Sequence, residues 1–533
     1  MNCLTSTTIV HRMTNGLVSL LSFALLAAST TASAYPLDGY ESTGISRLLH
    51  QRWVQEGKID GKKRPSGELM PLEMIRLKMQ ERDSFRLPPA DSQLSAAMKK
   101  LLGQHANRYG VALLDLSDPE QPRYAQWNGT LRQNVGSVGK LLVALGILQA
   151  LADVYPNDIE ARQKVLREAM IVADGFSVYD HHSVRMFDAQ TETLTRRPLH
   201  EGDTASMWTY LDWMMSPSSN SAAGMLQKHL ILLSHYGTAY PVSRDEERRF
   251  FKDTPRKQLS EIFADAIQTP ITRNNLDLEQ IRQGSFFTRG GKQRVDGPSS
   301  YATPRSLIQL LVKMEQGQLV DEWSSLELKR LMYITERRIR YGSSAALRSS
   351  ALYFKSGSLY SCVEEAGFTC KKYHGNKRNF MNSVAIVETQ AGQERLYYMV
   401  VVISNVLRQN SAVDHRDLAR ALHQRLLQDH PAKPLAKGAL PPAATYGKDF
   451  IGYAEEQAAQ RVKVDVQEAL LVLGYDIGDI DGVIGPKTRG AIREFQKTQG
   501  VTADGVPTTT LVATMKRVAE QKGLARPYSQ ATD

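Results

Sequence analysis

Segments that favour β-strands lie near the two ends of one long stretch of this 533-residue chain, and this arrangement constrains its fold most strongly. Short segments rich in apolar and aromatic residues predict strands at 110–116, 123–127, 352–355, 383–387 and 396–403. Helical sequence dominates from 137 to 311, and a helix at 418–427 follows the last strand. We therefore expect one large α+β domain over residues 96–428.

A proline- and alanine-rich segment at residues 429–451 separates this domain from the end of the chain. Such a composition is typical of a semi-rigid linker. A small helical unit follows at 452–520, and residues 35–95 form a polar N-terminal extension with an amphipathic stretch at 72–79. The net charge of +10 is spread along the chain and suits an anionic envelope polymer, a membrane surface or a plain solvated surface. No nucleic-acid motif accompanies it, so we expect no nucleic-acid partner.

Residues 1–34 have the features of a secretory signal peptide, with an apolar run at 17–28 and a small-residue cleavage site at 32–34. Cleavage would release the mature chain into the periplasm or cell envelope, and an uncleaved anchor is the alternative. The apolar run at 141–151 is too short to cross a bilayer and predicts a buried core helix. We therefore expect no stable membrane span after cleavage.

The predicted mature chain has two cysteines, Cys362 and Cys370. An even number of cysteines in an oxidising compartment favours one disulfide, and two free thiols are the alternative. No Cys-x-x-Cys pair is present, so neither zinc nor redox chemistry is indicated and no cofactor is expected.

Ser137 and Lys140 form a Ser-x-x-Lys pair directly before the apolar run. Residues three apart share one face of a helix. Ser137 would stand at the N-terminus of that helix, where backbone N–H groups stabilise negative charge. A desolvated Lys140 would be neutral near pH 7 and able to accept the hydroxyl proton of Ser137. The pair alone is a weak signal, because most such pairs are a helix cap and a surface lysine.

Two further motifs follow Ser137 in the chain. Ser218 and Asn220 form a Ser-x-Asn motif, in which the serine can relay a proton and the asparagine can bind a substrate amide. Lys355, Ser356 and Gly357 end a predicted strand. They offer positive charge for a carboxylate, a hydroxyl donor, and room for a substrate backbone against the strand. Either motif alone would be an ordinary cap or turn.

In this order the three motifs resemble those of class A β-lactamases and penicillin-binding proteins. The predicted hairpin before Ser137, the apolar helix after it, the run Tyr301 to Pro304 and the closing strands and helix are also similar to the class A-like family. The resemblance covers residues 96–428. It implies an antiparallel sheet flanked by helices, and an acyl-enzyme mechanism with β-lactams as substrates or inhibitors.

Carried over position by position, the resemblance also implies roles for single residues. These are Ser137 as the acylated nucleophile, Lys140 as its base, Ser218 as the proton relay, Asn220 as a ligand of the substrate amide, and Lys355 and Ser356 as ligands of the substrate carboxylate. The oxyanion hole would be formed by the backbone N–H groups of Ser137 and Ser358.

The chain departs from that family in the loop that normally carries the deacylation base. Class A β-lactamases have there a glutamate that activates a water, but residues 286–296 contain none and are basic. Asp296 is the only acid of this loop, and Glu279 lies upstream in a predicted helix at 276–283. We therefore expect a long-lived acyl-enzyme with β-lactams. Residues 238–300 are expected to be an insertion that shapes or covers the cleft.

Asp174, Asp180, His181 and His182 form a cluster of possible metal ligands. Their spacing matches no established ligand pattern. A solvated polar loop is the preferred interpretation, so no metal site is predicted.

The C-terminal unit contains an Asp-Gly-Val turn twice, at 481–483 and 504–506. With its helical segments, it closely resembles the three-helix peptidoglycan-binding domain of cell-wall hydrolases. Glycan contacts in that family lie near the Asp-Gly turns, which makes Asp481, Gly482 and Thr488 candidate contacts and peptidoglycan the expected partner.

Together the two resemblances imply a D,D-peptidase-like serine hydrolase that cleaves peptidoglycan stem peptides while tethered to the wall. The first alternative is a class A-like β-lactamase with an unrecognised deacylation base. The second is a non-catalytic wall-binding protein with a vestigial site, against which the intact motifs argue.

Overall fold

The computed structural model describes residues 39–389, 396–431, 462–477 and 484–522. The predicted signal peptide, most of the predicted linker, and the candidate contacts Asp481 and Gly482 lie outside these residues.

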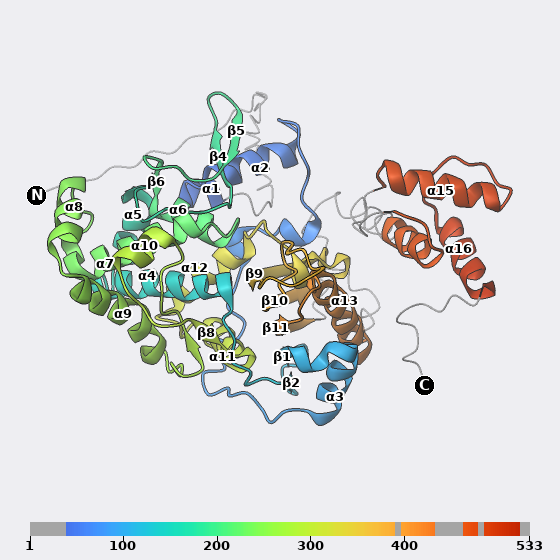
Figure 1. The fold of residues 1–533 in the computed structure, drawn as a ribbon, viewed down its shortest axis with the longest axis horizontal. Coiled ribbons are helices and arrows are strands. Elements are labelled where there is room, and N and C mark those ends of the chain that lie inside the picture. Colours follow the sequence, from blue (N-terminus) through green and yellow to red (C-terminus); the bar gives the residue numbers. More distant parts are fainter. Residues whose placement is uncertain (1–38, 390–395, 432–461, 478–483, 523–533) are drawn as a thin grey trace, which may run out of the picture. The chain divides into compact units, whose positions relative to one another are not determined.

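An antiparallel sheet of five strands runs through the large domain in the order β2-β1-β11-β10-β9 (Figure 1). Its strands are β1 (Tyr109–Asp115), β2 (Arg123–Trp127), β9 (Ser350–Ser361), β10 (Arg378–Thr389) and β11 (Tyr397–Asn405). The first and last strands are neighbours, with Tyr109 of β1 opposite Ser404 of β11. The sheet thus joins the two ends of the domain, and the predicted α+β class is confirmed.

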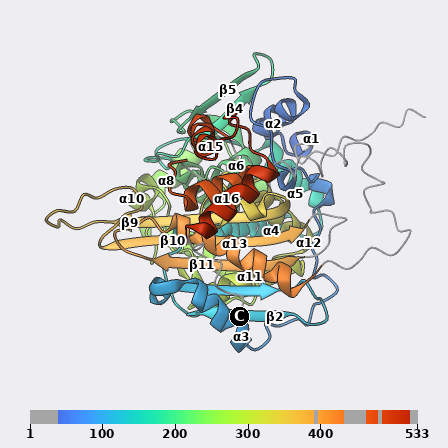
Figure 2. The ribbon, with the colours of Figure 1, turned by 90° about the vertical axis from the view of Figure 1, so that its right-hand side faces the viewer.

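Both faces of the sheet are covered, because successive side chains of a strand point to opposite sides. Ala112 and Leu114 of β1 enter the main core, whereas Val111 and Leu113 enter a second core. The main core is closed by α4 (Lys140–Val154), α5 (Ile159–Glu168), α6 (Met207–Met215), α7 (Asn220–Tyr236), α9 (Arg256–Arg273), α11 (Pro304–Glu315) and α12 (Glu322–Tyr333). The second is closed by α3 (Ser92–Leu101) and α13 (Ala412–Asp429), which Figure 2 shows crossing the sheet.

The middle of the domain is less uniformly helical than predicted. It also holds three two-stranded sheets. These are β3 (Met170–Val172) with β6 (Thr204–Ser206), β4 (Val184–Asp188) with β5 (Thr193–Arg197), and β7 (Ile281–Arg282) with β8 (Tyr301–Ala302). The helix predicted at 276–283 is wrong, because the Asp277 side chain accepts a hydrogen bond from the Glu279 N–H and closes a turn that leads into β7.

Short helices complete the domain. They are α1 (Gly39–Thr43), α2 (Ser46–Glu56), α8 (Arg244–Asp253), α10 (Arg289–Arg294) and the 3-10 turns η2 (Ser66–Glu68), η3 (Leu72–Met74), η4 (Gly103–Arg108), η5 (Gly136–Gly139), η6 (Gly237–Ala239), η7 (Arg340–Ser343) and η8 (Ala345–Leu347).

The helical segment Gly136–Val154 is the one stretch of the described residues that is long and apolar enough to cross a membrane. Within the structure, 83% of its most apolar window is buried. Its side chains pack against α7 and α9, so it forms the central helix of the large domain, in agreement with the predicted core helix.

The N-terminal extension packs into the large domain instead of standing apart from it. Ile45, Leu48 and Ile75 lie in the main core although they precede residue 96. Arg47 of α2 forms a buried ion pair with Asp212 of α6. These contacts make the extension a structural part of the domain.

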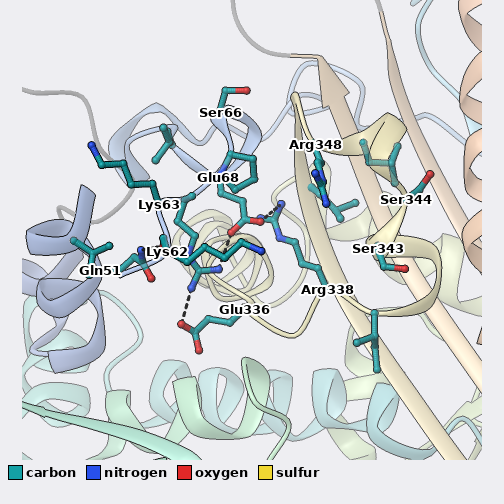
Figure 3. A pocket seen from close by; sticks show the side chains of 18 of the residues that line it. Gln51, Lys62, Lys63, Ser66, Glu68, Glu336, Arg338, Ser343, Ser344 and Arg348 are labelled. Atoms are coloured by element: carbon teal, nitrogen blue, oxygen red, sulfur yellow. Dashed lines mark hydrogen bonds and ion pairs between the residues drawn. The ribbon is translucent and has the colours of Figure 1, made fainter. Parts of the chain in front are cut away.

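A basic groove separates residues 62–69 of the extension from residues 336–348, as Figure 3 shows. Ion pairs cross it, since Arg64 contacts Glu336 at 2.7 Å and Arg338 contacts Glu68 at 3.5 Å. The two ion pairs therefore connect the extension to the rest of the domain across the groove.

The C-terminal unit has a small core of its own. Residues 462–472 are helical, and α15 (Pro486–Thr498) and α16 (Thr509–Gln521) follow. Leu470, Phe495 and Met515 meet between the three helices. Thr488, predicted as a glycan contact, is only 2% exposed and directs its hydroxyl to the backbone oxygen of Ile477. This threonine therefore faces the core of the unit.

Candidate active site

Ser137 and Lys140 lie at the start of the central helix, as predicted. Ser137 is in η5, and Lys140 is the first residue of α4. The Lys140 side chain is completely buried, and its Nζ lies 3.1 Å from Ser137 Oγ. An uncharged amine at this distance can accept the hydroxyl proton.

The motif strand β9 passes so close to Ser137 that only glycine fits. A Cβ atom on Gly357 would lie 2.0 Å from the backbone oxygen of Val135 and 2.8 Å from the backbone nitrogen of Ser137. Gly136, with φ of +54°, faces the backbone of Ser358 in the same way. The close approach explains both glycines, and it brings the backbone N–H groups of Ser137 and Ser358 to one region, as the predicted oxyanion hole requires.

The Ser-x-Asn motif closes the site from the N-terminus of α7. Ser218 adopts a left-handed backbone with φ of +67°, a strained conformation for serine. Its backbone oxygen then accepts a hydrogen bond from Lys140 Nζ at 2.7 Å, and Asn220 Oδ1 accepts another at 2.8 Å. The Ser218 hydroxyl lies between two lysines, 3.3 Å from Lys140 Nζ and 2.8 Å from Lys355 Nζ. Ser218 is thus placed to pass a proton.

Burial lowers the pKa of both lysines. Desolvation lowers the pKa of Lys140 to about 7, with Asp180 opposing and Arg337 adding to this effect. Desolvation also lowers the pKa of Lys355, and the charges of Lys140 and Arg337 lower it further. A substantial fraction of Lys140 is therefore neutral at physiological pH.

Asp180 is a site residue whose role the sequence did not reveal. One carboxylate oxygen accepts hydrogen bonds from Ser219 Oγ and from the backbone N–H groups of Asn220 and Ser221. The other accepts three more, from the backbone N–H groups of His181 and His182 and from the His182 ring. These bonds, and the ring, lower the pKa of the carboxyl although burial opposes them.

The hydrogen bonds of Asp180 also affect whether Asp180, His181 and His182 could bind a metal ion. Ligand atoms of Asp180, His181 and His182 lie within 4.8 Å of one another. The carboxylate is already occupied by donors from both sides, so the cluster acts as a cap on α7. Asp174 instead pairs with the buried Lys228 at 2.9 Å.

The loop that lacks a glutamate presents an aromatic ring to the site. Lys140 Nζ lies 4.9 Å from the centre of the Phe287 ring. The two acids considered in its place point elsewhere, because Asp296 pairs with Arg256 and Glu279 with Arg132, all four on the surface. Among the described residues, neither acid contacts Lys140 or Ser137.

A second group of site residues that the sequence did not reveal is a cationic cluster beside β9. Arg337 and Arg340 follow α12, and both contact Tyr373 in the loop between β9 and β10. The sulfurs of Cys362 and Cys370 in that loop lie at disulfide distance, with Cα atoms 6.1 Å apart.

A serine beside a buried amine, a second serine between two lysines, and a glycine-bearing strand define a serine hydrolase of the β-lactamase and penicillin-binding superfamily. Residues 93–426 match the beta-lactamase enzyme family, and the chain belongs to this family. Residues 464–515 match the putative peptidoglycan binding domain. Both predicted resemblances are confirmed.

Solved structures similar to this chain include a β-lactamase from Sphaerobacter thermophilus DSM 20745, with 14% identity, a TM-score of 0.40, and coverage of 64% of this chain and 100% of that one. PBP-A has 13% identity, a TM-score of 0.40, and coverage of 64% and 100%. A β-lactamase from Chitinophaga pinensis DSM 2588 has 15% identity, a TM-score of 0.40, and coverage of 63% and 99%. No curated protein matches the sequence.

Proposed function

We propose that this chain is an exported, penicillin-recognising serine acyl-enzyme hydrolase that acts on peptidoglycan stem peptides. The observation that carries the proposal is the buried network joining Ser137, Lys140 and Ser218. The peptidoglycan-binding domain at 464–515 supports the substrate, because a tether raises the local concentration of wall peptides.

Acylation begins when Ser137 Oγ attacks the carbonyl carbon of the scissile amide. Lys140 Nζ, 3.1 Å away, takes the hydroxyl proton, for which its pKa of about 7 is suited. The negative charge that develops on the carbonyl oxygen is stabilised by the backbone N–H groups of Ser137 and Ser358.

The leaving nitrogen needs a proton before the tetrahedral intermediate can collapse. Ser218 donates its hydroxyl proton to this nitrogen and is reprotonated by Lys140, whose Nζ lies 3.3 Å from Ser218 Oγ. Lys355 holds the same hydroxyl at 2.8 Å and orients it. The amine departs, and Ser137 carries the acyl group.

Hydrolysis of the acyl group requires an activated water. The loop presents the Phe287 ring beside Lys140, and this ring supplies no base. Once a peptide's amine has departed, a water in its place attacks the acyl carbon and passes its proton through Ser218 to Lys140, which returns a proton to Ser137 as the acyl group leaves. A bound penicillin, which keeps its leaving group attached, is therefore expected to stay on Ser137. This favours a peptidase over the alternative of a β-lactamase.

Incubating the mature protein with a fluorescent penicillin tests the proposal. We expect a stable adduct on Ser137, located by peptide mass spectrometry, and none on Ser137→Ala. Ser299→Ala, on the exposed surface, is the matched control and should label as the unaltered protein does.

The other outcomes are decisive in different ways. Rapid loss of label with release of hydrolysed penicillin would establish the β-lactamase instead. Absence of label, with retained binding to isolated sacculi, would establish a non-catalytic wall protein. Equal labelling of Ser137→Ala would remove Ser137 from the nucleophile's role.

A further inference from the structure

Arg337, Arg340 and Tyr373 form a cluster beside β9, and Arg340 also lines the basic groove. Arg337 donates to the backbone oxygen of Pro217, next to Ser218, at 3.4 Å and to the Tyr373 hydroxyl at 3.3 Å. The Arg340 guanidinium lies 5.1 Å from the centre of the Tyr373 ring. These contacts place two cations and a phenol directly beside the Ser-x-Asn motif.

Neither arginine has a carboxylate partner among the described residues. Arg340 is only 3% exposed, and its Nε has no hydrogen-bond partner in that part of the chain. Arg47 and Arg162 are equally buried, yet each forms an ion pair with an aspartate. Because burial of an unpaired charge is costly, Arg340 is incomplete without an anion.

The excess of positive charge around Lys355 also favours an anionic ligand. Lys140, Lys355, Arg337 and Arg340 are mutually close enough for their charges to lower the pKa of Lys355. Burial lowers the pKa of Arg340 itself to about 10. Asp180, which borders Lys140, is occupied by six hydrogen bonds and cannot serve the arginines.

The positive charges of the two arginines also act on the phenol of Tyr373. Burial raises its pKa, but the charges of Arg340 and Arg337 outweigh burial and lower it. A single carboxylate held by Lys355 and Ser356 would leave both guanidinium groups without an anion. The geometry therefore offers places for two anionic groups.

We propose that Arg337, Arg340 and Tyr373 form a second carboxylate subsite, separate from the one at Lys355 and Ser356. The substrate class is then a stem peptide with two free carboxylates near the scissile bond, one of them on a side chain. Guanidinium groups suit this ligand because they donate paired hydrogen bonds to a carboxylate. The inference rests on the proposed function and narrows its substrate.

Two short peptides ending in D-alanyl-D-alanine test the subsite. They differ only in whether the side chain of the preceding residue ends in a carboxylate or a carboxamide. The measured quantity is the peptide concentration that halves the rate at which fluorescent penicillin labels Ser137. We expect the carboxylate peptide to act at a concentration lower by about tenfold, the effect of one charge-assisted hydrogen bond.

Variants identify the residues responsible. Arg340→Met and, at a half-buried position, Arg337→Gln should bring the two concentrations within about twofold of each other, since the charged donors are removed. Arg338→Gln is the matched control from the same segment, because its guanidinium faces Glu68 in the basic groove, and it should keep the difference. Continued labelling of Ser137 shows that each variant is folded.

Failure of the inference is distinguishable from failure of the proposed function. Equal concentrations for the two peptides in a labelled, unaltered protein overturn the subsite but leave Ser137 as nucleophile. Retention of the difference in both Arg340→Met and Arg337→Gln also overturns it. Absence of labelling in the unaltered protein overturns the proposed function, and the subsite with it.

Discussion

At the scale of single residues, burial of Lys140 determines how the reaction depends on pH. Only the neutral amine can accept the Ser137 proton, and its pKa is about 7. We expect the rate of penicillin labelling to rise as pH increases from 5 to about 8 and to level off above, with half of the maximal rate near pH 7. Lys140→Met should lower the rate by about 10²–10⁴-fold, the usual contribution of a general base, and flatten this profile. An unchanged profile in Lys140→Met would assign the titration to another group.

Asp180 is expected to matter for stability through its hydrogen bonds. Its pKa is lowered in the folded protein, so its stabilisation is fully present above the unfolded pKa of about 4 and is lost as pH falls below that value. Asp180→Asn should lower the free energy of unfolding at pH 7 by about 2–4 kcal/mol, because several donors lose a charged acceptor. Urea unfolding at pH 7 and pH 3 measures both effects. Asp245→Asn, at an exposed site, should change little at either pH.

At the scale of secondary-structure elements, a buried ion pair between Arg47 and Asp212 holds α2 against α6. Arg47 and Asp212 are 3% and 0% exposed. Arg47→Ala should lower the free energy of unfolding by about 3–5 kcal/mol, since Asp212 would be left buried without its charge partner. Arg47→Met with Asp212→Leu should recover much of the loss. Urea unfolding is the measurement, and a loss below about 1 kcal/mol in Arg47→Ala would mean that the extension is not fastened by this pair.

These elements also show what the sequence can and cannot reveal. The strands of the main sheet were predictable, because their apolar runs are long and buried on both faces. The exposed β5 was not, since its polar residues carry no alternation toward a core. The three motifs were recognisable from short spacings, whereas Asp180 meets Ser219 from 39 residues away. Arg340 likewise reaches Tyr373 only through the fold, and apolar residues of the extension are scattered among charged ones.

At the scale of the whole molecule, the large domain and the C-terminal unit do different parts of one task. Each has its own hydrophobic core, so neither needs the other's side chains to complete its interior. The proposed nucleophile, Ser137, and the two lysines near it all lie in the large domain. Under the proposed function, the C-terminal unit contributes by holding Ser137 near polymeric substrate, and the two contributions are separable by experiment.

A chain that ends at residue 431 provides that separation. Its labelling by soluble penicillin should stay within about twofold of the full-length rate, because the residues around Ser137 are unchanged and soluble substrate gains nothing from a tether. Its binding to isolated sacculi should fall by at least about tenfold, since one of two linked binding sites is removed. Co-sedimentation with sacculi and the rate of labelling are measured on the same preparations. Ser137→Ala in the full-length chain should show the opposite pattern, with binding kept and labelling lost. If the shortened chain instead binds sacculi as tightly as the full-length chain, the large domain itself holds the wall and the tether has another role.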